Sequence, residues 1–198
     1  MPAEDCLDVR PPLEFALDRR KAVSFLLGAA AAATIAGDVG AADLYGMRHD
    51  GREAAPGDIG GWRLVYFGYT RCPDVCPMSL QSMALALGEL GPVGERITPV
   101  FVTLDPERDT SKAVADYVAF FSPRFIGLTP NAEQLERLAK EWRVTYKRVE
   151  VKDRDSYLID HTASIFLVDP SGSIVGKYPH DLDGPGLAKR IRASMLAH

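Results

Sequence analysis

The sequence predicts an α/β domain with a central sheet that is mostly parallel or mixed, flanking helices, and an N-terminal signal or membrane anchor before it. Three features support this. Strand-like and helix-like segments alternate, two cysteines separate the first strong strand from the first helix, and an apolar run follows basic residues near the N terminus. The 198 residues, 46% hydrophobic and 25% charged, fit one globular domain plus an extension. The net charge of -4 provides no basic stripe for phosphates, so nucleic acid is not an expected partner.

The N-terminal segment resembles an export signal. Arg19, Arg20 and Lys21 precede an uncharged, alanine-rich run at residues 22–36, and small residues follow it. A membrane-spanning helix needs about 20 apolar residues, with about 17 at the low end, so the run is short for a permanent anchor. A cleaved signal and a retained anchor both stay open, and the paired arginines resemble a twin-arginine signal. A buried alanine-rich core helix is the alternative.

This leader sets the expected compartment and the domain boundary. Its basic residues should stay in the cytoplasm, so residues 1–42 form the leader with its signal or anchor, and residues 43–198 form an exported domain. We therefore expect a periplasmic protein, or one on the outer face of the cytoplasmic membrane. Cys6 belongs to the leader, which leaves Cys72 and Cys76 as the only cysteines of the exported domain, in a compartment where disulfides persist.

The exported domain is expected to alternate strands and helices. Apolar runs predict strands, and periodic apolar positions predict helices, two of which follow the capping residues Thr110 or Ser111 and Asn131. The last two strands flank Asp169-Pro170-Ser171-Gly172, which predicts a hairpin. The expected strands are about 64–67, 98–104, 143–151, 164–168 and 173–178, and the expected helices are about 78–90, 111–121, 132–142 and 185–196.

The two cysteines of the segment Cys72-Pro73-Asp74-Val75-Cys76-Pro77 form the candidate site. A turn from a strand into a helix presents backbone N–H groups and the positive end of the helix dipole, which favour thiolates. Such a pair can bind a soft metal ion, exchange with other thiols, or close into a disulfide. Two buried apolar cysteines or a static disulfide are the alternatives, but the flanking prolines and Asp74 are typical of turns and helix starts.

A strand ending at a two-cysteine loop, a helix, a second strand and a late hairpin together outline the thioredoxin-like fold. Within this outline, four segments in order resemble the motifs of the Sco/SenC family. That family contains copper-handling proteins that help assemble the binuclear copper centre of cytochrome c oxidase. The similarity runs from about Leu64 to Val175. The four segments are residues 66–77, 103–110, 125–129 and 157–162.

The resemblance implies a copper metallochaperone, and not an enzyme, that holds copper with Cys72, Cys76 and His161. Two thiolates and one neutral imidazole suit the soft ion Cu(I), and Cu(II) is the alternative oxidation state. The implied partners are the copper-bearing subunit of cytochrome c oxidase, a thiol reductant protein and another copper chaperone. The membrane is a further partner if the N-terminal segment is retained.

Departures from reductases of the same fold keep a second function open. Here three residues separate the cysteines instead of two, and Ala163 stands where those reductases carry a cis-proline. The alternative is a thiol–disulfide oxidoreductase in which Cys72 attacks and Cys76 resolves the mixed disulfide. A peroxidase would need an activated cysteine and an arginine, for which Arg71 is a weak candidate. The segment 43–62 is short for the N-terminal hairpin of the family, which puts strand pairing there in doubt.

Other polar residues are assigned structural or open roles. Asp74 is expected to favour the turn and helix start rather than to bind metal. The charged loop containing Asp105, Arg108 and Asp109 either orients the site or is an ordinary surface ion-pair cluster. The remaining histidines are expected to be solvated: His49, His180 and His198.

Overall fold

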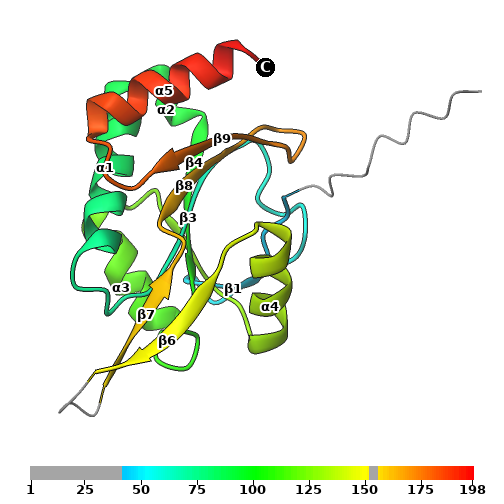
Figure 1. Cartoon of the computed structure of the whole chain (residues 1–198). Coiled ribbons are helices and arrows are strands. Elements are labelled where there is room, and N and C mark those ends of the chain that lie inside the picture. Colours follow the sequence, from blue (N-terminus) through cyan, green and yellow to red (C-terminus); the bar gives the residue numbers. More distant parts are fainter. Residues whose placement is uncertain (1–41, 152–155) are drawn as a thin grey trace, which may run out of the picture. The chain divides into compact units, whose positions relative to one another are not determined.

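The structure, a computed structural model, describes residues 42–151 and 156–198. Its helices and strands alternate through the first two thirds of this range, and a hairpin and a helix end it (Figure 1). The strands are β1 (Gly46–Arg48), β2 (Glu53–Ala54), β3 (Trp62–Gly68), β4 (Ile97–Thr103), β5 (Ile126–Thr129), β6 (Tyr146–Glu150), β7 (Tyr157–His161), β8 (Ser164–Val168) and β9 (Ile174–Pro179). The helices are α1 (Val75–Glu89), α2 (Pro92–Glu95), α3 (Ser111–Phe121), α4 (Ala132–Glu141) and α5 (Gly184–Leu196).

The main sheet is mixed, with strand order β2-β1-β5-β4-β3-β8-β9. The three inner strands β3, β4 and β5 are parallel because helical crossovers connect them, whereas β1, β2, β8 and β9 pair antiparallel. Strand β3 lies inside the sheet, next to the central strand β4, with Val65 between Val100 of β4 and Phe166 of β8. The strand that leads to the cysteines is therefore held on both sides.

Side chains that alternate along β3 fill two cores, one on each face of the sheet. Leu64 and Tyr66 belong to the core formed with α1, α3 and α5, and Val65 and Phe67 to the core formed with α4. Figure 1 shows the same division, with α4 on the opposite side of the sheet from α1 and α3. All four of these β3 side chains have no exposed surface, which explains the continuous apolar run.

Strands β6 and β7 form a separate two-stranded sheet, which extends away from the main sheet in Figure 1. Tyr146 of β6 pairs with His161 of β7, and Glu150 pairs with Tyr157 at the other end. The sequence analysis predicted β6 within residues 143–151 but placed no strand at residues 157–161. Short, mixed polar and apolar sequences such as β7 carry a weak strand signal.

The structure corrects the predicted start of the first helix. Helix α1 begins at Val75 instead of residue 78, so Cys76 lies in its first turn and not in the preceding loop. Proline at residue 77 does not prevent this, because the first turn of a helix has no intrahelical partners for its N–H groups. The predicted N-cap of α3 is confirmed, since the Thr110 side chain accepts a hydrogen bond from the Ala113 N–H.

The N-terminal hairpin is present despite the short segment available to it. Met47 of β1 pairs with Glu53 of β2 and with Thr129 of β5, so both strands join the main sheet. The predicted leader and its apolar run, with Cys6, lie in residues 1–41, outside the described residues. Among the residues that the structure describes, no helix combines the length and the apolar character needed to cross a membrane.

Candidate metal centre

The two cysteines lie where β3 turns into α1. Cys76 is fully buried in the first turn of α1, and Cys72 retains 9% of its surface in the preceding loop. The Cys76 backbone N–H points at Cys72 Sγ, at 3.5 Å. This N–H is one of those left without an intrahelical partner at a helix start, so the helix offers the Cys72 sulfur both a donor and the positive end of its dipole.

Gly68, the last residue of β3, makes room for the buried sulfur. A Cβ at this position would lie 2.8 Å from Cys76 Sγ and 3.0 Å from the ring of Tyr66. The Tyr66 hydroxyl is also directed at Cys76 Sγ, at 3.9 Å. Gly68 is not among the site residues predicted from the sequence, although a glycine at the end of a buried strand is a known sign of close backbone or ligand approach.

His161 reaches the sulfurs from the end of β7. Its Nε2 lies 3.6 Å from Cys76 Sγ, and its Nδ1 lies 3.1 Å from the backbone oxygen of Thr162. A carbonyl oxygen only accepts hydrogen bonds, so Nδ1 carries the proton in the neutral ring and Nε2 presents its lone pair to the sulfurs. The rings of Tyr66 and Tyr69 meet the imidazole edge to face, at centroid distances of 6.2 and 6.0 Å.

The two thiols have opposite pKa shifts. A hydrogen bond from Cys76 lowers the pKa of Cys72 to about 4, against the opposing effect of burial. The same interaction and burial raise the pKa of Cys76. When the two thiols together carry a single proton, that proton is therefore on the buried Cys76 and Cys72 is the thiolate. Burial is also the main cause of the raised pKa of Tyr66, which keeps its hydroxyl a donor toward the sulfur.

A buried carboxylate holds the loop that precedes Cys72. Asp109 has no exposed surface, and its oxygens accept from the Thr70 N–H at 2.9 Å, the Thr70 hydroxyl at 2.6 Å and the Thr103 hydroxyl at 2.6 Å. Asp105, on the same loop, is only 2% exposed. These two acids are therefore not part of a surface ion-pair cluster, and Asp109 orients the cysteine loop through Thr70.

Asp74 lies at the helix start as expected but without a side-chain cap, and the expectation for His49 is corrected. Asp74 occupies the N-cap position of α1, but its side chain makes no capping hydrogen bond, because its backbone angles of -140° and -79° differ from those of an ordinary cap. His49 is not simply solvated: it is half-buried, and its Nδ1 accepts from the Gly127 N–H at 3.0 Å. His180 is partly exposed, and neither Asp74 nor these histidines joins the group formed by the two cysteines and His161.

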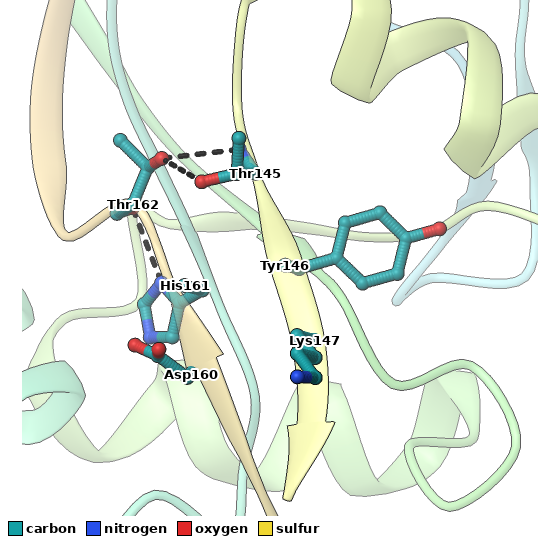
Figure 2. Close-up of a pocket in the computed structure, with 6 residues that line it drawn as sticks. All are labelled: Thr145, Tyr146, Lys147, Asp160, His161 and Thr162. Carbon is teal, nitrogen blue, oxygen red and sulfur yellow. Dashed lines mark hydrogen bonds between the residues drawn. The ribbon is translucent and has the colours of Figure 1, made fainter.

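The hairpin surface beside His161 carries a cavity of 190 Å³. Figure 2 shows His161 next to Asp160 on β7, with Lys147 facing them from β6 and the Tyr146 ring turned to the other side of that strand. At the base of the hairpin, the Thr162 hydroxyl accepts from the Thr145 backbone N–H at 3.0 Å and is hydrogen-bonded to the Thr145 hydroxyl, also at 3.0 Å. The imidazole thus sits at the edge of the protein, between the cavity and the sulfurs.

The structure brings the three side chains singled out in the sequence together. Within the described part of the chain, Cys72 Sγ, Cys76 Sγ and a ring nitrogen of His161 form a group of possible metal ligands whose atoms all lie within 4.8 Å of one another. Two soft sulfurs and one neutral imidazole suit Cu(I) or Zn²⁺ better than hard ions, which prefer oxygen. The two sulfurs also differ in the way that thiol exchange requires: Cys72 has a lowered pKa and keeps a small exposed surface, whereas the Cys76 thiol is fully buried.

Known proteins share this whole domain. Residues 41–196 match the family model described as SCO1/SenC. The chain belongs to the SCO1/SenC family. The mitochondrial SCO1 homolog of Homo sapiens is 38% identical over 156 residues, which cover 76% of this chain and 50% of that protein. The mitochondrial SCO2 homolog of Bos taurus is 36% identical over 162 residues, covering 80% and 61%. The chain thus spans little more than half the length of these relatives.

Solved structures of SCO1/SenC proteins confirm the thioredoxin-like α/β fold with a mixed central sheet. Arabidopsis thaliana ScoI, a structure with copper bound, superposes with a TM-score of 0.73 at 34% identity and covers 80% of this chain and 99% of that one. Yeast Sco1, also with copper bound, superposes with a TM-score of 0.71 at 28% identity and covers 80% and 89%. Both relatives are thus copper-binding proteins with this fold.

Proposed function

We propose that this SCO1/SenC protein is a copper metallochaperone. It holds Cu(I) with Cys72, Cys76 and His161 and delivers it to the binuclear copper centre of cytochrome c oxidase during assembly. The observation that carries the proposal is the meeting of these three donors, from two separate segments of the chain, within 4.8 Å of one another. Copper bound to relatives that share the fold supports the choice of metal.

The chemistry of the donors fits this cargo. The Cys72 thiolate is available at neutral pH, and copper binding at Cys76 displaces the proton that the buried thiol otherwise keeps. Thr162 holds the Nδ1 proton of His161, which leaves Nε2 free for the metal. A site with three donors leaves the ion open to a fourth ligand, so a thiolate of the oxidase subunit can join before a donor of the chaperone leaves.

An anaerobic Cu(I) titration tests the proposal. The reduced protein should bind one Cu(I), and His161→Ala should bind it more weakly by a factor on the order of 100 or more, since even partners outside the first ligand shell are worth about 10- to 100-fold. His180→Ala, a partly exposed histidine outside the ligand group, is the matched control and should keep the affinity of the unaltered protein. Equal affinity of His161→Ala and the control would exclude the three-ligand site.

A second function, thiol–disulfide reductase, is favoured by the arrangement of the two sulfurs: Cys72, which keeps 9% of its surface and has a lowered pKa, lies beside the fully buried Cys76 thiol. In such a reaction the Cys72 thiolate attacks a partner disulfide, forming a mixed disulfide and releasing one partner thiolate. Cys76 then loses its proton and attacks the Cys72 sulfur, which releases the second partner thiol. The partner gains two electrons, and a thiol reductant protein must then reduce the Cys72–Cys76 disulfide.

Disulfide reduction by the variants separates the two functions. A reductase needs both cysteines but not the imidazole as a ligand. Cys76 is the main cause of the lowered Cys72 pKa and His161 a smaller one, so His161→Ala should keep most of its rate of reduction while Cys72→Ser loses it. If His161→Ala loses copper affinity and the protein reduces no disulfide substrate, the chaperone function stands alone. Rapid reduction by His161→Ala would assign the thiols to exchange chemistry.

We also propose that residues 1–42 export the domain formed by residues 43–198 to the periplasm, or to the outer face of the cytoplasmic membrane if the leader is retained. The basic residues before the apolar run support this orientation. Alkaline phosphatase, which folds to an active enzyme only after export, can be fused after residue 42. Activity in intact bacteria is expected, and its absence would place the domain in the cytoplasm.

A further inference from the structure

The His161 ligand lies on an element that the main sheet does not hold. Strands β6 and β7 pair only with each other, and isolated two-stranded hairpins are marginally stable in water. The threonine contacts at the base of the hairpin join its own two strands and add no link to the cysteine loop. The end of β7 at His161 is tied to the main sheet by the short connection to β8, and contacts along the rest of the strand help to keep Nε2 at its distance of 3.6 Å from Cys76 Sγ.

Three side chains make that contact, and we call them the Asp105 clamp: Asp105, Arg108 and Tyr157. The Tyr157 hydroxyl donates to Asp105 Oδ1 at 2.7 Å, and Arg108 Nε donates to the other carboxylate oxygen. Arg108 Nη1 donates to the backbone oxygen of Tyr157 at 3.0 Å, and its guanidinium stacks on the Tyr157 ring, 3.4 Å from the centroid. The three residues thus form a closed ring of contacts between the loop after β4 and the first residue of β7.

The ion pair of the clamp is largely withdrawn from water, and Tyr157 beside it is half-buried. Asp105 and Arg108 keep 2% and 14% of their side-chain surface exposed. A buried ion pair holds its partners tightly, because losing either one leaves an unpaired buried charge. Arg148 covers the outer face of the Tyr157 ring at 3.8 Å, but it is 45% exposed and pairs with the exposed Glu107. Exposed pairs of this kind contribute little, so the inner side of the ring carries the attachment.

The clamp acts on the face of β7 that carries His161. Side chains two residues apart in a strand share a face, so Tyr157, Ile159 and His161 project from the same side of β7. Ile159 is 7% exposed and belongs to the core that also contains both cysteines. The ligand face of the strand is thus fixed by the clamp at its first residue and by core packing at its middle, and its last residue meets the sulfurs.

The same loop also holds the cysteine side of the site. The Asp105 backbone oxygen accepts from the N–H of Asp109 at 2.9 Å, and Asp109 binds Thr70 just before Cys72. One turn of chain therefore contacts both segments that supply the metal donors. Asp109 fixes the thiolate loop, and the clamp fixes the imidazole hairpin.

We propose that Asp105, Arg108 and Tyr157 are positioning residues that set His161 at ligand distance from the two sulfurs. The inference rests on the proposed copper site, since it assigns a role to residues that act through one of its ligands. The hydrogen bonds of the clamp join its three members to one another and do not involve the two sulfurs or the imidazole. Their contribution to copper binding should therefore exist only when His161 is present.

The experiment is a double-mutant cycle in Cu(I) affinity. Tyr157→Phe removes one hydroxyl and should weaken Cu(I) binding about tenfold, the scale of an outer-shell partner. In the His161→Ala background the same change should have no further effect. Tyr178→Phe removes another hydrogen-bonded tyrosine hydroxyl, which donates to Ser194 on α5 at 2.8 Å, and should leave the affinity within about twofold, because changes at distant sites are independent.

Two further measurements make the outcome specific. Electron paramagnetic resonance of the Cu(II)-loaded Tyr157→Phe protein should show weakened nitrogen coupling, which a loss of general stability would not produce. Arg108→Lys keeps the charge but cannot bridge Asp105 and Tyr157 with a planar fork, so it should also bind Cu(I) less tightly. This variant decides the question if Tyr157→Phe does not fold.

The outcomes separate this inference from the proposed function. The positioning role is overturned if Tyr157→Phe lowers the Cu(I) affinity equally in the unaltered protein and in the His161→Ala background. It is also overturned if Tyr157→Phe binds Cu(I) as tightly as the control Tyr178→Phe. Either result would leave the copper site intact. If the unaltered protein binds no Cu(I), or His161→Ala binds it unchanged, the proposed function itself fails. A loss confined to proteins that retain His161 supports both.

Discussion

Replacing Gly68 with alanine tests whether the end of β3 is reserved for the sulfur of Cys76. The added Cβ would lie 2.8 Å from Cys76 Sγ, 3.0 Å from Tyr66 Cε1 and 3.1 Å from Phe101 Cε2. All three neighbours have no exposed surface. Contacts of a Cβ under 3.0 Å are essentially never observed, so the sulfur must move, and a close-packed interior leaves it little space.

The expected cost follows from this overpacking. Forcing one extra methyl group into a well-packed core costs about 1–3 kcal/mol of unfolding free energy. A protein of this size loses about 2–4 °C in Tm per kcal/mol, so Gly68→Ala should lower Tm by about 2–12 °C. The displaced sulfur is also a proposed copper ligand, and we expect the Cu(I) affinity to fall at least about tenfold, the effect of disturbing a ligand's surroundings.

Thermal unfolding of the reduced, copper-free protein and an anaerobic Cu(I) titration measure the two effects separately. Gly88→Ala is the matched control, because nothing lies within 4 Å of a Cβ at this position in α1. There alanine should stabilise the helix by up to about 1 kcal/mol. A Gly68→Ala protein with unchanged Tm and unchanged affinity would refute the view that Cys76 needs the space beside residue 68.

Three other predictions concern the surroundings of the site and the fold. Thiolate absorbance of reduced, copper-free protein should be lost as the pH falls through about 4, since Cys76 donates to Cys72; a midpoint near the ordinary 9.0 would contradict this. Asp109→Asn places an amide NH₂ group against the N–H and hydroxyl donors of Thr70, so it should lower the free energy of unfolding measured in urea by about 1–3 kcal/mol. Unchanged stability would mean that this carboxylate is dispensable. Arg143 directly follows the C-cap residue of α4 and has a φ of 51°, so Arg143→Gly should raise Tm by the equivalent of about 1 kcal/mol; a fall in Tm would contradict backbone strain at this position.

The main elements of the fold follow from local sequence where burial is uniform. Strands β3 and β4 are fully covered on both faces, so they read as continuous apolar runs, and their positions are predicted within two residues. Helix α3 is predicted with its bounds because Thr110 caps it. The short strands β5 and β7 are missed, because pairing with distant segments defines them and their own residues do not.

The candidate site divides in the same way between local and distant information. Cys72, Cys76 and His161 were identified from residue chemistry and the resemblance to the Sco/SenC family, and the structure brings their side chains together. The parts that sequence reasoning left unassigned act across the fold. Asp109 bonds to a residue 39 positions away, and Tyr157 bonds to one 52 positions away. The spacing of residues within one motif cannot predict hydrogen bonds to residues so far away in the sequence.

Copper binding and disulfide exchange use the same two sulfurs, so the redox state decides which chemistry is available. A disulfide between Cys72 and Cys76 leaves no thiolate for copper, and bound copper occupies the thiolate that would attack a disulfide. His161 distinguishes the two chemistries, because the imidazole can donate to the metal but takes no part as a thiol in disulfide exchange. The clamp at Tyr157 then matters only for the first chemistry. The imidazole also helps to lower the pKa of Cys72, but Cys76 is the larger cause. Mutations along the hairpin should therefore reduce copper affinity much more than the reactivity of the thiols, and that difference identifies the function of the site.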